Sequence, residues 1–210
     1  MRQRDIVDQE KLDGSLTIVG AGAVGSFTAL TLAKMGYAGD MYVYDGDIVE
    51  AHNLPNQFHP TNSIGLSKVK ALCQTVLQFS DKEIDGTPVK IDELGHSYGV
   101  MFALDSMDGR ILLYNTIKKE TQWLFDARMG AELMRIYTIN LKDKKDIALY
   151  EKTLYPSAKA KQLPCTAKSV IYNVAVIAGL LTNQVKKAMM GEDYKREIIF
   201  DLKTLQLLTN

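Results

Sequence analysis

The feature that most constrains this chain is a glycine-rich turn, Gly20-Ala21-Gly22-Ala23-Val24-Gly25, which directly follows a short hydrophobic run. That run, residues 15–19, is rich in β-branched side chains, as expected of a buried parallel strand. Residues 27–35 then carry apolar side chains at helical spacing, and Gly36 ends the pattern. Residues 41–44 are a second predicted strand. Strand, glycine turn, helix and strand in this order form a βαβ unit, which predicts an α/β fold.

The glycine turn also predicts a nucleotide site. The GxGxxG spacing puts glycine where the chain turns sharply, where backbone approaches phosphates and where helix meets strand. The helix that follows offers N–H groups and the positive end of its dipole to phosphates. Asp45 ends the second strand, where a carboxylate can accept hydrogen bonds from ribose hydroxyls. The alternative is a turn used only for tight helix packing. The predicted nucleotide-binding residues are Gly20, Gly22, Ala23, Val24, Gly25 and Asp45.

The rest of the chain continues the α/β pattern as one domain, residues 1–210. We expect a Rossmann-like, doubly wound, mainly parallel sheet with an antiparallel C-terminal extension. Residues 142–164 are polar and lysine-rich, which predicts a mobile crossover loop. The further predicted helices are 67–79 (with Val69, Leu72, Val76 and Leu77 as its buried stripe), 110–121 and 165–190. The further predicted strands are 88–91, 100–104, 123–126, 132–140 and 198–207.

Charge and cysteine content narrow the class of protein. Lysine plus arginine and aspartate plus glutamate both number 25, so net charge gives no reason to expect nucleic acid or an anionic membrane as a partner. We see no signal-peptide pattern and no run near the roughly 20 apolar residues of a membrane span. The two cysteines, Cys73 and Cys165, form neither a disulfide framework nor a paired CxxC zinc module. These features predict a reduced, cytoplasmic protein.

The residues after Asp45 are unlike those of a dehydrogenase, although the turn alone would suggest NAD. Residues 45–57, DGDIVEAHNLPNQ, and residues 64–68, IGLSK, resemble the ThiF–MoeB family, the activating enzymes of ubiquitin-like proteins. The family pattern there is D-x-D-x-V-[ED]-x-[SH]-N-L-x-R-Q, followed by I-G-x-x-K. Residues 105–110, DSMDGR, are similar to the family's D-x-x-x-x-R after the fourth strand. The resemblance covers nearly the whole chain and is most specific between Gly20 and Lys68.

The resemblance implies an ATP- and Mg²⁺-dependent adenylyltransferase. In this family a C-terminal carboxylate attacks the α-phosphate of ATP, which gives an acyl-adenylate and pyrophosphate. The implied partner is a ubiquitin-like or sulfur-carrier protein, or a short peptide, with a free C-terminus. The family also implies a homodimer.

The resemblance assigns roles to individual residues. Asp105 matches the family's Mg²⁺-binding aspartate, and a hard oxygen ligand is what Mg²⁺ requires beside phosphates. Lys68 matches a lysine that reaches the phosphates, where it would stabilise developing charge. Asp47 and Asn53 match positions that line the nucleotide site, and Gln57 matches the last residue of the signature.

Each of these residues also has a purely structural alternative. Lys68 can be a solvated lysine at a helix start, and Asp105 can cap the turn that follows it. We interpret Asp108 as a turn residue. Arg110 either orients Asp105 or packs on the sheet.

The chain departs from the family pattern at Asn56, where the family has an arginine that contacts the triphosphate. This change removes an always-charged phosphate ligand. Three alternatives follow: another arginine compensates, turnover is weak, or the site binds nucleotide without chemistry. An N-terminal arginine of the family also reaches ATP, often from the other subunit, and Arg4 is the candidate here.

Cys165 is a candidate nucleophile. The tripeptide Pro164-Cys165-Thr166 is similar to the P-x-C-T signature around the thioester-forming cysteine of ubiquitin-activating enzymes. A position at a helix N-terminus, near Lys161 and Lys168, would favour the thiolate. Cys165 would then attack the acyl-adenylate to give a thioester or acyl-persulfide-type intermediate. The alternative is a small buried cysteine. Cys73, in mid-helix, is predicted to lie in the core.

The favoured function is therefore activation of a carboxylate by adenylation, with two rivals. Asn56 favours a non-catalytic or weakly active nucleotide-binding partner protein. The glycine turn alone favours an NAD-dependent oxidoreductase, which leaves Lys68 and the residues around Asn53 without a role. Exchange of pyrophosphate with ATP separates these alternatives.

Overall fold

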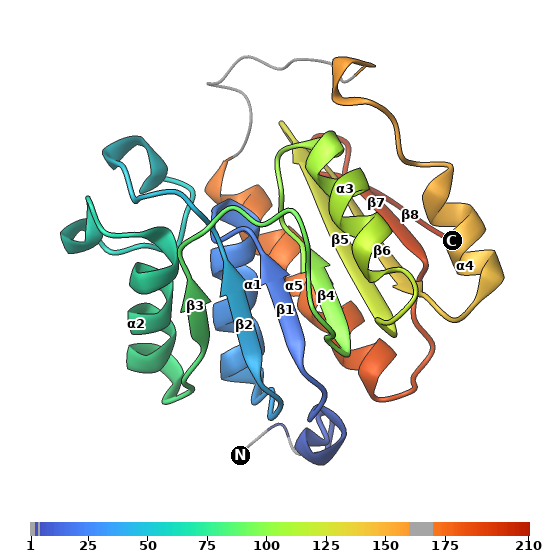
Figure 1. Ribbon diagram of the computed structural model, residues 1–210, viewed down its shortest axis with the longest axis horizontal. Coiled ribbons are helices and arrows are strands. Elements are labelled where there is room, and N and C mark those ends of the chain that lie inside the picture. Colours follow the sequence, from blue (N-terminus) through green and yellow to red (C-terminus); the bar gives the residue numbers. More distant parts are fainter. Residues whose placement is uncertain (1–2, 4, 160–169) are drawn as a thin grey trace.

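An eight-stranded sheet runs through the middle of the computed structural model, which describes residues 3, 5–159 and 170–210 (Figure 1). The strand order is β3-β2-β1-β4-β5-β6-β7-β8. The first five strands in this order are parallel, and β6, β7 and β8 continue the sheet antiparallel. The predicted fold class is confirmed. The strands are β1 Leu16–Val19, β2 Met41–Tyr44, β3 Asp85–Thr87, β4 Gly99–Phe102, β5 Trp123–Gly130, β6 Leu133–Asn140, β7 Glu197–Asp201 and β8 Gln206–Thr209.

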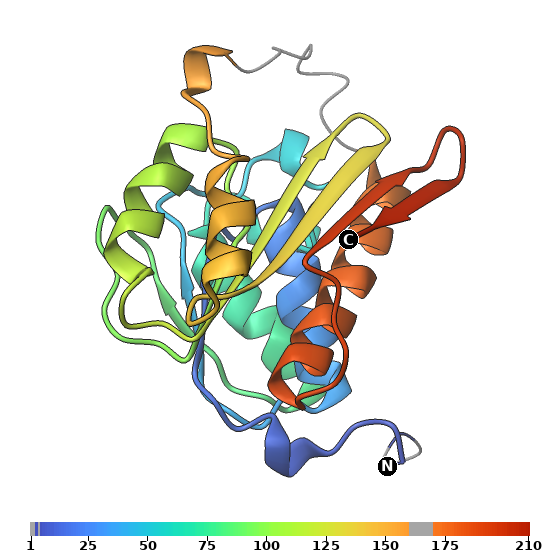
Figure 2. The same ribbon diagram turned by 90° about the vertical axis from the view of Figure 1, so that its right-hand side faces the viewer.

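Helices cover both faces of this sheet (Figures 1 and 2). One hydrophobic cluster joins α1, α2 and α5 to the sheet, and a second joins α3 and α4 to the opposite face. The central strands β1 and β4 are buried along their whole length, because a parallel sheet with helices on both sides leaves neither face to water. The helices are α1 Ala23–Met35, α2 Lys68–Ser80, α3 Met107–Ile117, α4 Lys144–Glu151 and α5 Ile171–Met189.

The strand order reverses at β1, which lies between β2 and β4. Val19, the last residue of β1, is in register with Tyr44 of β2 and Phe102 of β4. The carboxyl ends of these three strands therefore meet at one edge of the sheet. In open α/β sheets the crevice at such a switch point is where ligands bind.

Two predicted strands differ from the structure. The strand predicted at 88–91 is wrong, because β3 ends at Thr87. Pro88 has no N–H for a ladder, and the Val89 N–H turns back to the Thr87 carbonyl (2.9 Å). The strand predicted at 198–207 is the hairpin of β7 and β8, whose connection includes Leu205 with a left-handed φ of 55°.

The loop predicted at 142–164 contains the helix α4, so the described part of this prediction is wrong. Asp143 caps α4 by accepting a hydrogen bond from the Lys145 N–H (2.7 Å). The lysines suggested a solvated loop, yet Asp146 and Tyr150, one turn apart, are completely buried against the sheet. Residues 160–164 of this segment lie outside the described residues.

Two other helices differ from the prediction, one in where it begins and one in its buried side. The helix predicted from residue 165 begins at Ile171, and Val170 before it is extended, with φ −132° and ψ 148°. In α2, Leu77 is 45% exposed and so does not belong to the buried stripe. Cys73 of the same helix is half-buried and packs against the core.

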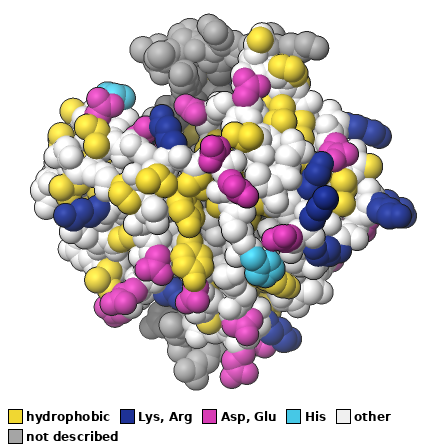
Figure 3. All heavy atoms as spheres, viewed as in Figure 1, with side chains coloured by type: hydrophobic (Ala, Val, Ile, Leu, Met, Phe, Trp, Pro, Cys, Tyr) yellow, Lys and Arg dark blue, Asp and Glu magenta, His cyan; other side chains and the backbone are white. Residues whose placement is uncertain are grey.

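Among the described residues, no helix combines the length and hydrophobicity needed to cross a bilayer. The face seen in Figure 3 carries both acidic and basic side chains, with hydrophobic ones gathered in a strip down its middle.

Candidate functional site

The glycine turn is closely packed at two of its three glycines. Gly20 has a left-handed φ of 104°, and a Cβ there would lie 2.4 Å from the Ala103 carbonyl oxygen. A Cβ on Gly25 would lie 1.8 Å from the Gly20 carbonyl oxygen. Gly22, by contrast, caps α1 and would bring a Cβ no closer than 3.8 Å to its one neighbour, the Gln57 side chain. Gly20 and Gly25 are therefore explained by packing, whereas Gly22 leaves the start of α1 open to a ligand.

Asp45 lies beside this turn and holds the main chain. One carboxylate oxygen accepts a hydrogen bond from the Ala21 N–H (2.7 Å), and the other from the Asp47 N–H (2.8 Å). An ionised carboxylate has about four acceptor positions, so about two remain for ribose hydroxyls. Asp45 can thus shape the turn and bind a sugar at once.

Lys68 and Asp47 form an ion pair at the start of α2. Lys68 Nζ lies 3.0 Å from one Asp47 oxygen, and Lys90 Nζ lies 3.3 Å from the other. The hydrogen bond from Lys68, helped by the charges of both lysines, holds the pKa of Asp47 below its usual value. Lys68 is only 7% exposed, so it is not the solvated lysine of the structural alternative. Lys90 was not predicted, because it follows Pro88 in a segment interpreted as a strand.

The loop after β2 is held against the start of α1. The Asn53 side chain is buried and accepts the hydrogen bond of a nearby main-chain N–H in its own loop (3.0 Å). Ser26 of α1 accepts from the Phe58 N–H (2.9 Å). Gln57 presents a buried Oε1 atom with no hydrogen-bond partner among the described residues. A buried acceptor left unpaired is costly, so this atom is a candidate contact for a bound ligand.

His59 was not predicted as a site residue, and it holds the glycine turn from behind. Its Nε2 lies 2.9 Å from the Ala21 carbonyl oxygen, which can only accept, so Nε2 carries the proton. Burial lowers the pKa of the imidazole, and this hydrogen bond opposes the shift only in part. The neutral ring is thus a structural part of the turn.

Asp105 lies in an exposed bend after β4, at the same edge of the sheet as the glycine turn. Its carboxylate makes no hydrogen bond or ion pair with any residue that the structure describes. The residue that caps α3 is Ser106, which accepts from the Gly109 N–H (3.2 Å), so Asp105 is not the cap. Asp108 is not a turn residue either. It lies in α3 and exchanges two hydrogen bonds with Ser157, at 2.9 and 3.0 Å.

A metal at Asp105 would need further ligands from elsewhere. The described residues contain no group of three histidine, cysteine, aspartate or glutamate side chains that could hold a metal ion. Mg²⁺ commonly takes one or two carboxylates and completes its shell with water and substrate phosphates. The single unpaired carboxylate of Asp105 fits this kind of coordination.

Arg110 does not contact the Asp105 carboxylate. Its Nε atom donates to Asp126 (2.8 Å), a completely buried residue of β5 that also pairs with Arg128 (2.7 Å). The side chain of Arg110 packs on β5, and its two Nη atoms also reach the carbonyls of Leu104 and Ser106, so the structure does not separate the two alternatives. The sequence does hold a signal for Asp126: it ends a run of buried strand residues, as Asp45 and Asp105 do.

Two predicted catalytic residues, Cys165 and Arg4, lie outside the described residues. The start of α5 at Ile171 removes the reason for placing Cys165 in the first turn of that helix. An arginine that replaces the one missing at position 56 could come from elsewhere in the chain. The structure describes four arginines, and each pairs with a carboxylate: Arg110 and Arg128 with Asp126, Arg135 with Glu197, and Arg196 with Asp146.

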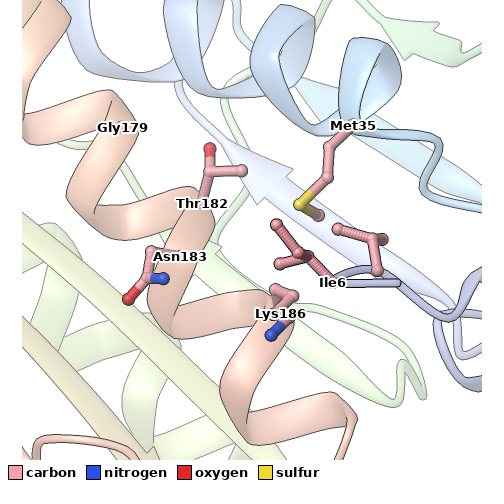
Figure 4. A pocket seen from close by; sticks show the side chains of 7 residues that line it. Ile6, Met35, Gly179, Thr182, Asn183 and Lys186 are labelled. Atoms are coloured by element: carbon pink, nitrogen blue, oxygen red, sulfur yellow. The ribbon is translucent and has the colours of Figure 1, made fainter. Parts of the chain in front are cut away.

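A separate shallow pocket of about 260 Å³ lies between α1, α5 and the N-terminal segment (Figure 4). Met35, the last residue of α1, lines it, so it lies at the opposite end of α1 from the glycine turn. Its lining is mostly apolar, with Ile6 and Val7 on one side and Thr182 and Lys186 of α5 on the other. This pocket is not part of the site described above.

Comparisons with known proteins identify a family and related folds. A sequence profile described as "ThiF family" matches residues 5–210. Ubiquitin-like modifier-activating enzyme 5 of Drosophila grimshawi is 38% identical over 84 residues, and the same enzyme of Caenorhabditis briggsae is 38% identical over 74. These matches cover 40% and 35% of this chain, but only 21% and 17% of the relatives.

Solved structures of low sequence identity share the fold. PaaA superposes with a TM-score of 0.78 at 18% identity, and E. coli MccB with ATP at 0.74 and 14%. E. coli MccB with AMPCPP and MccA gives 0.76 at 15%. Each superposition covers 96% of this chain and 65% of the other, so the chain spans about two thirds of these structures.

Proposed function

Because the chain belongs to the ThiF family, we propose that it activates a carboxylate by adenylation, with ATP as the nucleotide and Mg²⁺ as the metal. The substrate would be the C-terminus of a ubiquitin-like or sulfur-carrier protein, or of a short peptide. The observation that carries the proposal is the meeting of the glycine turn, Asp45, the Asp47–Lys68 pair and the unpaired Asp105 at one sheet edge. A dehydrogenase would have no use for the buried lysine or for Asp105.

The residues fit ATP at several points. The open backbone at Gly22 and the start of α1 suit phosphates, and Asp45 retains acceptor positions for ribose hydroxyls. Gln57 Oε1 is a buried acceptor in need of a donor. The E. coli MccB structures with ATP and with AMPCPP and MccA support this choice of nucleotide and substrate class.

The reaction would proceed by attack of a substrate carboxylate oxygen on the α-phosphorus of ATP. The bond to the β-phosphate breaks, pyrophosphate leaves, and an acyl-adenylate forms. Lys68 would exchange part of its contact with Asp47 for a phosphate oxygen and stabilise the charge that develops there. Asp105 would hold Mg²⁺, which neutralises phosphate charge when bound.

The test is exchange of labelled pyrophosphate with ATP in the presence of candidate carriers. We expect exchange that requires both Mg²⁺ and a carrier with a free C-terminal carboxylate. The matched control is the same carrier with an amidated C-terminus, which should give none. No exchange with any carrier would contradict the proposal.

A second candidate, a nucleotide-binding partner protein without catalysis, is favoured by Asn56. Lys68 and Lys90, which both contact Asp47, are candidates for the missing charge, as are the residues outside the described part. Binding of ATP without exchange would support this candidate.

The thioester step also belongs to the proposal. After adenylation, the Cys165 thiolate would attack the acyl carbon and release AMP. A Cys165→Ala variant should still exchange pyrophosphate but form no thioester with the carrier. Thioester formed by that variant would exclude Cys165.

A further inference from the structure

We propose that Arg110 and Asp126 are positioning residues that hold the Asp105 loop in place for the metal. This inference rests on the proposed function, since Asp105 is assigned to Mg²⁺ only there. Asp105 is exposed, and no described residue fixes its carboxylate. Its position therefore depends on how firmly the main chain on each side is held.

Arg110 holds the main chain on both sides of Asp105. Its Nη2 atom donates to the Leu104 carbonyl (2.6 Å), and its Nη1 atom reaches the Ser106 carbonyl (3.4 Å). Leu104 and Ser106 are the two neighbours of Asp105 in the chain. The guanidinium thus bridges the bend at whose tip Asp105 lies, and only a planar fork with several donors can do so.

Asp126 fixes the guanidinium that makes this bridge. Its Oδ1 atom accepts from Arg110 Nε (2.8 Å), and Arg110 Nη2 also donates to the neighbouring Ala127 carbonyl (2.9 Å). Both contacts are made to β5, which lies between β4 and β6 in the sheet. Asp126 is opposite Phe102, the last residue of β4, so the anchor lies directly beside the loop that it holds.

The other oxygen of Asp126 extends the same network to α4. It accepts from Arg128 Nε (2.7 Å) and from the Tyr150 hydroxyl (3.0 Å). Arg128 in turn donates to the carbonyl and the hydroxyl of Thr153, both at 3.0 Å. Burial opposes ionisation of Asp126, but the two guanidinium groups outweigh it and keep its pKa below the usual value. All the groups needed to keep a buried charge paired are present.

The packing of α3 against α4 reinforces the arrangement (Figure 2). The two helices lie side by side on one face of the sheet, and Asp108 exchanges hydrogen bonds with Ser157 just beyond α4. The Tyr114 hydroxyl of α3 also donates to Glu151 of α4 (3.2 Å). The loop that carries Asp105 is therefore held from β5 and from the α3–α4 layer together.

The experiment compares Arg110→Lys with Arg196→Lys. Both changes keep a positive charge opposite a buried carboxylate, Asp126 or Asp146, but Arg196 contacts neither neighbour of Asp105. The same comparison is made with Asp126→Asn and Asp146→Asn. Because Asp126→Asn can fail to fold, Arg110→Lys is the deciding variant.

Three measurements report how firmly the Asp105 loop is held. Hydrogen exchange should become faster in residues 103–110 of Arg110→Lys and remain unchanged there in Arg196→Lys. The Mg²⁺ concentration for half-maximal pyrophosphate exchange should rise about tenfold, as for other residues that orient metal ligands, while the rate at saturating Mg²⁺ stays within about threefold. Mn²⁺ bound in the presence of a non-hydrolysable ATP analogue, measured by electron paramagnetic resonance, should weaken in parallel.

The outcomes separate this inference from the proposed function. If the wild-type protein catalyses no exchange, the proposed function fails, and hydrogen exchange in residues 103–110 still decides whether Arg110 positions the loop. If Arg110→Lys folds and leaves both hydrogen exchange and metal dependence unchanged, the inference is overturned. An equal loss in Arg110→Lys and Arg196→Lys would also overturn it, because it would reflect general destabilisation.

Discussion

Lys68 is the residue whose loss should most affect chemistry. It is a buried cation that contacts the Asp47 carboxylate at the edge of the sheet that carries the glycine turn. We expect Lys68→Met to lower the rate of pyrophosphate exchange about 10²- to 10³-fold, the usual cost of removing one group that stabilises charge in a transition state. The rate at saturating ATP is the measurement.

The control for this prediction is Lys70→Met, on the exposed side of the same helix. It removes the same charge from α2 and should leave the rate within about threefold, since exposed charges act weakly through water. An equal loss in both variants would mean that Lys68 acts only through the net charge of α2.

His59 predicts a pH dependence of stability. Burial depresses its pKa below the ordinary value of 6.5, so the unfolded chain binds the proton more readily than the folded one. The stability that His59 contributes is therefore complete above about pH 6.5 and is lost as the pH falls through the folded pKa. Urea unfolding of the wild type between pH 8 and 5 should show this loss.

A His59→Gln variant can keep the hydrogen bond to Ala21 through its amide but cannot take up a proton. It should therefore lose less stability on acidification than the wild type. His52→Gln is the control, because His52 is exposed in the same loop and should follow the wild type. Identical pH profiles for all three proteins would contradict the assigned role of His59.

Some site residues could be predicted from the sequence, and others could not. Asp45 and Asp105 could be placed at one edge, because they follow strands whose ends must meet there. Lys68 begins α2 and was predicted only from the family's I-G-x-x-K motif. His59 and Lys90 could not, since their roles depend on how an irregular loop folds back on the glycine turn. For Arg110 the sequence left open whether it orients Asp105 or packs on the sheet. Its contacts with both β5 and the Asp105 loop could not be predicted without knowing where β5 lies.

At the scale of the element, the glycines where the turn meets α1 differ in role: Gly25 is needed for packing, and Gly22 leaves room for a ligand. We expect Gly25→Ala to lower the free energy of unfolding by about 1–3 kcal/mol or more, because its Cβ would meet the Gly20 carbonyl oxygen at 1.8 Å. Gly22→Ala should change it by at most about 0.5 kcal/mol, since nothing lies closer than 3.8 Å. Chemical denaturation of both variants checks this.

The same pair of variants should behave differently towards nucleotide. Gly22→Ala should fold normally yet bind ATP more weakly, because the added methyl group lies where phosphates approach the start of α1. Titration calorimetry of the folded variant with ATP and Mg²⁺ is the measurement. Unchanged ATP affinity in Gly22→Ala would move the phosphates away from the turn.

Elements were predicted best where their pattern was local. The β1–α1–β2 unit follows from its hydrophobic runs and glycines. The helix α4 was missed, because its lysines face water. Its buried side is revealed only by Asp146 and Tyr150, and Asp146 contacts Asn140 of β6 and Arg196, the residue before β7. Tertiary partners of this kind are not visible in a sequence window.

At the scale of the whole molecule, the proposed homodimer can be tested by complementation. If Arg4 acts on the site of the other subunit, a mixed dimer of Arg4→Ala and Lys68→Met protomers has one site with both residues intact. Equal mixing of the two variants should then restore about a quarter of the wild-type exchange rate, the share expected for random two-fold dimers. Sedimentation velocity should show the dimer directly. No recovery from two well-folded variants would place Arg4 outside the partner's site.

The thermal stability of the folded chain should report which nucleotide it binds. A ligand at a hundred times its dissociation constant stabilises the folded state by about 2.7 kcal/mol, which corresponds to a rise in Tm of roughly 5–10 °C for a chain of this size. We expect this shift with ATP and Mg²⁺, a smaller one when Mg²⁺ is removed or in Asp105→Asn, and none with NAD at equal concentration. A shift with NAD alone would favour the oxidoreductase, because Asp45 and the glycine turn serve either nucleotide. A shift with ATP but no exchange would favour a binding protein without catalysis. The thermal shift thus reports the identity of the nucleotide, and only the exchange assay reports whether Lys68 and Asp105 act on it.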